Sequence, residues 1–153
     1  MASKLPEIII KAIGIVRNGM EQLPKGGYNW ERIISDIVIH SSLVEALDNL
    51  EEFSHIIVLY WMHQSTVSGQ LLTKVHPMAK HELPLVGLFA TRSPHRPNPV
   101  GKATVRLLQC RDNILKVEGL DAINGTPVID IKPYIPGYDS ATNATVPSWI
   151  NSQ

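Results

Sequence analysis

The sequence predicts one mainly β domain, with antiparallel strands and one or two short helices. A length of 153 residues favours a single domain. Short segments with strand-like patterns are separated by turn residues, and no regular strand–helix alternation recurs. The 11 prolines and 10 glycines favour short elements over long helices. Short connections favour antiparallel pairing, because a parallel pair needs a crossover of about a dozen residues or more.

The first 40 residues contain two predicted strands around a loop. Glu7–Val16, which reads EIIIKAIGIV, is rich in β-branched residues and ends at the polar Arg17-Asn18-Gly19. Residues 20–31 contain proline and glycine with little periodicity, so they are predicted to form a loop. Residues 32–40 then form the second strand.

A short helix is predicted next. Ser42 and Glu45 have the spacing of a capping box, in which the hydroxyl accepts from the Glu45 amide and the carboxylate reaches back. Three leucines follow at near-helical spacing, and the helix is expected to end near Phe53.

The middle of the chain is expected to combine a central strand with a long excursion. Residues 54–62, SHIIVLYWM, are apolar at alternate and intervening positions, as in a strand covered on both sides. Residues 63–84 form a long excursion, a feature that is often functional in compact domains. Leu85–Ala90 resumes a strand-like pattern.

The second half is predicted to contain three more strands. Val100–Cys110 alternates between apolar and polar residues, and Ile114–Glu118 follows after the turn Asp112-Asn113. Asn124-Gly125 marks another reversal before the strand Val128–Ile131. We expect the folded domain to span residues 1–138 and residues 139–153 to form a polar, partly ordered tail.

Composition and charge exclude several classes of protein. Lys and Arg number 14 and Asp and Glu also 14, which argues against a protein that coats nucleic acid non-specifically. The longest apolar run, residues 56–62, is far shorter than the ~20 residues that span a bilayer. The single Cys110 and the absence of a secretory pattern in MASKLPEIII predict a cytoplasmic protein without a membrane segment.

A local basic segment stands out from this neutral average. No acidic residue occurs from Leu83 to Arg111, whereas five arginines and lysines do. Within it, residues 87–101 read GLFATRSPHRPNPVG, and three prolines in six positions require an extended, stiff loop. Such a loop would hold its polar side chains ready for a carboxylate or phosphate; they are Arg92, His95, Arg96 and Asn98. A solvated strand face and a rigid turn with its cations in water are the alternatives.

Three further polar residues lie at turns or strand ends. Asp121 and Asp130 flank turns, where a carboxylate can accept from ribose hydroxyls or a base amine; the alternatives are an Asx turn and an exposed strand position. His63, followed by Gln64, comes directly after the apolar strand and is either a site residue or a solvated strand end.

The sequence lacks the motifs of several common metal, nucleotide and hydrolase sites. The sequence contains no Cys pair and no HExxH, and His76 and His81 lack a convincing third ligand, so no metal is expected. The sequence also lacks GxxxxGK[ST], GxGxxG and GxSxG, which argues against a P-loop, a Rossmann-type site and a serine hydrolase.

Three blocks of the sequence resemble the signatures of a known family. They are EEFSHIIVLYWMHQ, GLFATRSPHRPNPVG and LDAINGTPVIDIKPYIP, and the opening IGIVRN fits as well. In this order they resemble the TsaA-like (TrmO-type) family over roughly residues 8–138. The resemblance implies an antiparallel β-barrel-like domain, a homodimer, and S-adenosylmethionine-dependent methylation of the exocyclic amine of threonylcarbamoyladenosine beside the tRNA anticodon.

The resemblance also assigns residues to the cofactor. The family's cofactor positions fall here on His63, Gln64, Arg92, Lys102, Glu118, Gly119, Leu120 and Asp121, with Lys25 and Gly26 as weaker assignments. Arg92 would bind the carboxylate of the amino-acid end, and Asp121 would accept from hydroxyls or adenine.

The reaction that the resemblance implies also suggests which residues would handle the methyl acceptor. Methyl transfer from a sulfonium is an in-line displacement, so positioning of the two reactants matters most. Asp130, Tyr134 or water would take the proton that the amine releases. The substrate-binding candidates on this chain are His95, Arg96, Asn98 and Arg106.

Two other functions remain open at this point. The neutral net charge also suits methylation of a small metabolite. A non-catalytic sensor that binds S-adenosylmethionine is the third hypothesis. Activity on RNA should fall steeply with ionic strength, whereas activity on a small neutral substrate should not.

Overall fold

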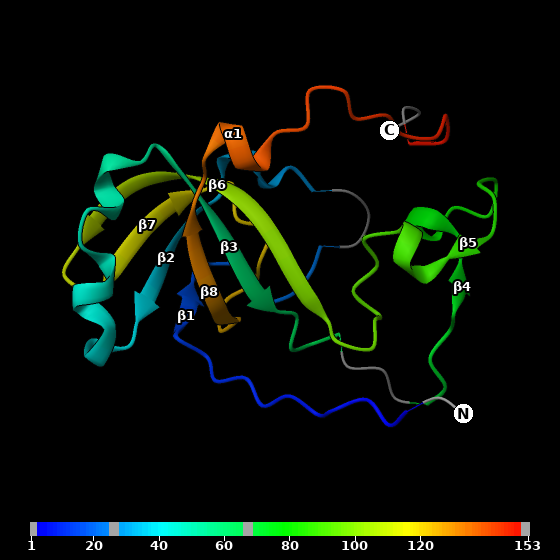
Figure 1. Ribbon diagram of the computed structural model, residues 1–153, viewed down its shortest axis with the longest axis horizontal. Helices are drawn as coiled ribbons and strands as arrows, with labels where there is room; N and C mark the ends of the chain where they lie inside the picture. The colour runs from blue at the N-terminus through cyan, green and yellow to red at the C-terminus, as the bar shows by residue number, and fades with distance from the viewer. Residues whose placement is uncertain (1–2, 25–27, 66–68, 151–153) are drawn as a thin grey trace.

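Six antiparallel strands close into a barrel in the computed structural model, which describes residues 3–24, 28–65 and 69–150 (Figure 1). The barrel strands are β1 (Gly14–Arg17), β2 (Ile34–Ile39), β3 (His55–Trp61), β6 (Val100–Arg111), β7 (Ile114–Glu118) and β8 (Pro127–Pro133). Their order around the barrel is β1-β2-β7-β6-β3-β8, and β8 pairs with β1 to close it. The predicted antiparallel, barrel-like architecture is confirmed.

Strand β3 occupies the central position that its apolar sequence predicts. It pairs with β6 on one side and with β8 on the other over nearly its whole length. In this register Tyr60 lies opposite Gly101 on β6 and Val128 on β8. The predicted hairpin of β6 and β7 also forms, and Asp112 adopts φ 54° in its turn.

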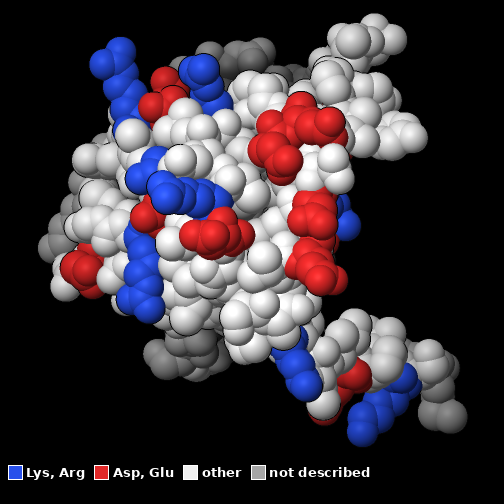
Figure 2. All heavy atoms as spheres, turned by 90° about the vertical axis from the view of Figure 1, so that its left-hand side faces the viewer, with Lys and Arg blue, Asp and Glu red and all other residues white. Residues whose placement is uncertain are grey.

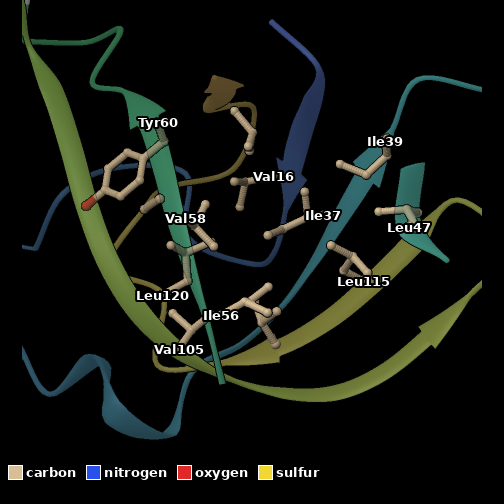
Figure 3. Packing of buried hydrophobic residues seen from close by; sticks show 13 residues of the cluster. Val16, Ile37, Ile39, Leu47, Ile56, Val58, Tyr60, Val105, Leu115 and Leu120 are labelled. Carbon is tan, nitrogen blue, oxygen red and sulfur yellow. The ribbon is translucent and has the colours of Figure 1, made fainter. Parts of the chain in front are cut away.

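The core fills the barrel with aliphatic side chains from all six strands. Val16, Ile37, Ile56, Val58, Val105, Leu115, Val117 and Val128 are at most 1% exposed. Leu120, from the loop after β7, is fully buried among them, and Figure 3 shows it beside Ile56 and Val105. Burial of each such side chain stabilises the fold by about 1.5–3 kcal/mol, so closure of the barrel is driven mainly by this cluster.

Two predicted strands are shorter than their sequences suggest. Of Glu7–Val16 only the last three residues belong to β1, and Ile8, Ile9 and Ile10 are exposed. β-Branched residues favour extended backbone, but β8 pairs with β1 only at Gly14 and Ile15, so no described strand lies beside the earlier residues. Leu85–Ala90 contains only the two-residue β5 (Val86–Gly87), followed by the 3-10 helix η5 (Leu88–Ala90).

The predicted helix from Ser42 to Phe53 forms as two 3-10 helices instead of one α-helix. These are η2 (Ser41–Leu47) and η3 (Leu50–Glu52), separated by Asn49 in the left-handed region. The capping-box prediction is wrong, because the N-cap is His40, whose Nδ1 accepts from the Ser42 amide. The remaining helices are η1 (Trp30–Arg32), η4 (Pro77–Ala79) and the α-helix α1 (Pro136–Asp139).

The excursion is longer than the predicted residues 63–84, because the chain leaves the barrel after β3 and returns only at β6; it covers residues 62–99. Its ends are joined by a hydrogen bond of 2.8 Å from the Met62 amide to the Pro99 carbonyl. The excursion carries the small sheet of β4 (Lys74–Val75) and β5, and it projects to one side of the barrel (Figure 1). The expected domain boundary at residues 138–139 falls within α1. After α1 the chain turns towards the excursion (Figure 1).

Candidate functional site

A cavity of about 210 Å³ opens to solvent where β3 ends. The end of β3 and the residues after it supply Tyr60, Met62, His63, Gln64 and Ser65 to its lining. The other segments supply Arg92 and Pro94 of the proline-rich loop, Asp121, Ala122, Ile123 and Thr126 after β7, and Leu23 and Trp30 before β2. Four segments that lie far apart in the sequence therefore meet at one end of the barrel.

Tyr60 and Asp121 form the best-defined polar contact of this cavity. The Tyr60 hydroxyl donates to Asp121 Oδ1 at 2.7 Å, and the tyrosine is only 4% exposed. Burial raises the pKa of Tyr60, and the charge and hydrogen bond of Asp121 raise it further. The phenol therefore stays protonated and holds a carboxylate at the cavity.

Gly101 makes room for the tyrosine. The ring of Tyr60 lies across β6 (Figure 3), where a Cβ atom on Gly101 would come within 2.4 Å of ring carbons. No side chain larger than hydrogen fits at this position while the ring stays in place.

The loop that carries Asp121 is anchored by Asn18. Asn18 Nδ2 donates to the Ala122 carbonyl at 2.8 Å and to Ser35 Oγ at 2.9 Å. The backbone N–H of Asn18 also donates to Asn124 Oδ1. In the other direction, the backbone N–H of Asn124 donates to the Met20 carbonyl. The residues after β1 and the residues after β7 are thus fixed to each other, which limits the movement of Asp121.

His63 lines the cavity and carries an unsatisfied nitrogen. Its Nδ1 atom is buried and has no hydrogen-bond partner. An unpaired buried polar atom is costly in a folded protein, so Nδ1 destabilises this part of the lining. Gln64 and Arg92, by contrast, are exposed at the mouth.

Arg96 braces the proline-rich loop. Its Nη1 donates to the carbonyls of Thr91 at 2.9 Å and Ser93 at 3.0 Å, and the guanidinium lies 5.8 Å from the centre of the Phe89 ring. The predicted stiffness of this loop therefore has a second cause besides proline. Arg96 Nη1 is thus engaged within the loop, and the contact of Arg96 with a substrate stays a prediction.

The structure brings together four of the residues that the resemblance assigned to a cofactor: His63, Gln64, Arg92 and Asp121. Leu120 belongs to the core, and Gly119 turns the chain after β7 with φ 96°. Glu118 pairs with Ile34 and Arg106 in the barrel wall, and Lys102 is exposed on β6 opposite Leu59. Lys25 and Gly26 lie outside the described residues.

The two candidate proton acceptors do not line the cavity. Asp130 Oδ2 forms an ion pair with Lys132 Nζ at 2.9 Å, which raises the pKa of the lysine. Tyr134 packs edge-on against His55, at the opposite end of β3 from the cavity. Of the substrate candidates, Asn98 is exposed near the end of the excursion, and Arg106 lies opposite His55.

Sequence reasoning missed much of the lining. The missed lining residues are Leu23, Trp30, Tyr60, Met62, Ile123 and Thr126. They gave no signal, because a single apolar or hydroxyl side chain beside a loop looks like ordinary core. Tyr60 could have been noticed as a hydroxyl in an apolar strand, but its partner Asp121 is set only by the fold. Within the described ranges no three His, Cys, Asp or Glu side chains gather as metal ligands, and no helix is long and apolar enough to cross a bilayer.

Fold and cavity together define a closed antiparallel β-barrel domain with a cavity at one end. The family model for the tRNA-methyltransferase O N-terminal domain matches residues 17–140. The chain belongs to this family.

Relatives agree in sequence and in structure. A probable S-adenosyl-L-methionine-binding protein of Archaeoglobus fulgidus is 39% identical over 141 residues, which are 90% of this chain and 37% of that protein. A protein of the same description from Methanothermobacter thermautotrophicus is 44% identical over 138 residues, 88% of this chain and 95% of its own. The crystal structure of TrmO from Pseudomonas aeruginosa matches with a TM-score of 0.74 at 29% identity, covering 95% of this chain and 63% of that one. The chain thus spans less than two thirds of some relatives.

Proposed function

We propose that this chain is an S-adenosylmethionine-dependent methyltransferase that acts on tRNA. One observation carries the proposal: His63, Gln64, Arg92 and Asp121, assigned to the cofactor through three separate sequence blocks, line one cavity. The names of the archaeal relatives and the family description support the same cofactor and reaction.

The chemistry of the lining fits S-adenosylmethionine. Asp121 is held ready to accept from ribose hydroxyls or the adenine amine, and the His63 side chain belongs to the same lining. Arg92 suits the carboxylate of the amino-acid end, since a guanidinium can bind a carboxylate through two bonds. Leu23, Trp30 and Met62 supply apolar surface.

The volume of the cavity limits how much of the cofactor it can enclose. Pockets for small ligands usually measure about 300–1,000 Å³, and this one holds about 210 Å³. Part of the cofactor therefore has to lie at the mouth, beside the exposed Gln64 and Arg92.

The residues of the chain act mainly by positioning. S-Adenosylmethionine supplies an electrophilic methyl group on a sulfonium, and transfer forms a nitrogen–carbon bond as the sulfur–carbon bond breaks. Tyr60 stays protonated and fixes Asp121, while Arg96 and Asn18 hold the two loops on either side. Because Asp130 and Tyr134 lie away from the cavity, the proton that the amine releases passes to water.

The acceptor is the exocyclic amine of threonylcarbamoyladenosine next to the anticodon. The resemblance implies this nucleoside, and the description of the matching family names tRNA. The acid-free segment from Leu83 to Arg111 supports an anionic substrate, although the net charge of the chain is zero. Such a substrate would place the protein in the cytoplasm.

Methyl transfer from labelled S-adenosylmethionine tests the proposal. We expect label on tRNA that carries threonylcarbamoyladenosine and none on unmodified tRNA. Asp121→Asn and Arg92→Gln should each weaken cofactor binding by about 10- to 100-fold in calorimetry, through loss of a charge-assisted hydrogen bond. Arg111→Gln, at the far end of β6, is the matched control. Unchanged cofactor affinity in both cavity variants would contradict this assignment of the cavity.

A second candidate is a non-catalytic S-adenosylmethionine-binding protein. The archaeal relatives are described as binding proteins and not as enzymes, which favours it. Tight cofactor binding without label on any tRNA would support this candidate over the methyltransferase.

We also propose the homodimer that the resemblance implies. Lys102 lies outside the cavity of its own chain and is exposed. In a dimer, the Lys102 of a second copy is one group that could complete this cavity. Sedimentation velocity at micromolar concentration tests the idea, and a monomer would contradict a site shared between copies.

A further inference from the structure

A second, larger hollow lies beside the cofactor cavity. This groove holds about 1110 Å³ and runs between the excursion and the C-terminal segment at Val146, Trp149 and Ile150. It shares Arg92 and Pro94 with the cavity of about 210 Å³. One wall of the proline-rich loop therefore faces both hollows, and the stiffness that Arg96 adds applies to both.

The groove has one sign of charge. Lys74, Arg92 and three histidines, His76, His81 and His95, line it, and no carboxylate is among the lining residues that the structure describes. Residues 70–111 contain seven Lys or Arg and a single acid, Glu82, in a chain whose charges otherwise cancel. On the barrel face turned away from the excursion, cationic and acidic side chains are interspersed (Figure 2). Of the seven, Lys102, Arg106 and Arg111 lie on β6 of the barrel, so the case for an anionic ligand rests on Lys74 and Arg92, which line the groove without a carboxylate.

The groove also offers flat ring surfaces. Phe89 is 78% exposed, and Arg96 supports its ring at 5.8 Å. The rings of His76 and His81 lie 4.8 Å apart, and His76 Nδ1 is bonded to the Leu83 carbonyl at 2.9 Å, which fixes this pair. Rings interleaved with cations are typical of surfaces that bind single-stranded nucleic acid, where bases stack and phosphates meet positive charge.

We propose that this groove binds the single-stranded RNA segment around the methyl acceptor and presents the acceptor base at the Arg92–Pro94 wall. The inference rests on the proposed function, because the wall matters only if the smaller cavity holds the methyl donor. Of the substrate residues suggested by the sequence, only His95 lines the groove. Most of the RNA contact thus falls on the excursion between Lys74 and Phe89, a segment in which the sequence assigned no substrate-binding residue.

The test measures RNA affinity and cofactor affinity separately on the same variants. Phe89→Ala should weaken binding of a fluorescent tRNA anticodon stem-loop by about tenfold or more, as loss of one stacked base does. Lys74→Gln should weaken binding at low salt and reduce the slope of log affinity against log salt by about one. Neither change should alter the dissociation constant of S-adenosylmethionine. Tyr138→Ala, an aromatic that is 85% exposed outside the groove, and Arg111→Gln are the matched controls, and both should bind RNA normally.

The outcomes separate this inference from the proposed function. If the wild type binds cofactor and methylates tRNA, but the groove variants bind RNA as tightly as the controls, the RNA groove is refuted and the methyltransferase stands. If the groove variants leave RNA affinity unchanged and instead convert a dimer to a monomer in sedimentation, the groove is an interface between two copies. Failure of the wild type to bind S-adenosylmethionine would refute the proposed function itself.

Discussion

Replacement of Gly101 by alanine is the sharpest test of how the barrel positions the cavity. The added Cβ atom would lie 2.4 Å from Cε2 and Cζ of Tyr60 and 2.9 Å from its hydroxyl oxygen. Tyr60 is 4% exposed, so the ring can move only towards the cavity that it lines, and the bond to Asp121 Oδ1 has to lengthen or break.

The expected cost has two parts. Overpacking in a core costs about 1–3 kcal/mol. The lost hydrogen bond adds about 1 kcal/mol, since the exposed Asp121 carboxylate can turn to water. We therefore expect Gly101→Ala to lower the free energy of unfolding by about 2–4 kcal/mol. In a domain of this length, a loss of about 3 kcal/mol corresponds to a Tm lower by about 6–12 °C.

Urea unfolding monitored by fluorescence measures this cost, and three companion variants assign it. Tyr60→Phe keeps the ring and removes only the bond, so it should lose about 1 kcal/mol. In a Tyr60→Leu background, which removes the obstructing ring, Gly101→Ala should cost less than about 1 kcal/mol. Gly137→Ala, where a Cβ meets nothing within 4 Å, should be close to neutral. The reasoning is refuted if Gly101→Ala unfolds within about 0.5 kcal/mol of the wild type, or costs the same in both backgrounds.

Further predictions follow from other contacts of the site. Asn18→Ala removes the bonds to Ser35 and Ala122 and should cost about 2–3 kcal/mol in urea unfolding while weakening cofactor binding; normal stability would contradict the anchoring role. Asp130→Asn should leave single-turnover methylation unchanged, because Asp130 lies outside the cavity, and a large loss of rate would restore it as proton acceptor. The raised pKa of Tyr60 means that the folded chain keeps a proton which the unfolded chain releases above pH of about 10. The free energy of unfolding should therefore fall as pH rises beyond about 10, and Tyr60→Phe should flatten this decline; an equal slope in both proteins would contradict it.

The barrel strands could largely be read from local pattern. Alternation in Val100–Cys110 and the two-sided apolar run of residues 54–62 define β6 and β3, because side chains of a strand alternate between faces. Closure of the barrel by β1 and β8 could not be read in the same way. It depends on pairing between segments more than a hundred residues apart, and the isoleucines of residues 8–10 gave a strand signal where no partner strand lies.

Family motifs pointed to some of the residues that line the cavity, whereas the other lining residues are set only by the geometry of the fold. His63, Arg92 and Asp121 were found through sequence blocks, and the fold brings them to one cavity. Tyr60 and Gly101 were missed because their roles arise from a cross-strand register that no local window contains. Arg96 was expected to face a substrate, and its Nη1 donates to carbonyl groups three and five residues away in its own loop, a contact that no sequence motif indicated.

The way in which the excursion joins the barrel separates two jobs within one chain. β3 and β6 pair directly, and the bond from Met62 to Pro99 closes the excursion at its base, so the barrel does not depend on what lies between. The entropy of closing such a loop grows only slowly with its length. The part of the excursion between Leu72 and Ala90, which lies outside the cavity lining, could therefore be exchanged between relatives while His63, Arg92 and Asp121 stay in place. Chimeras of this part would show which acceptor each excursion selects.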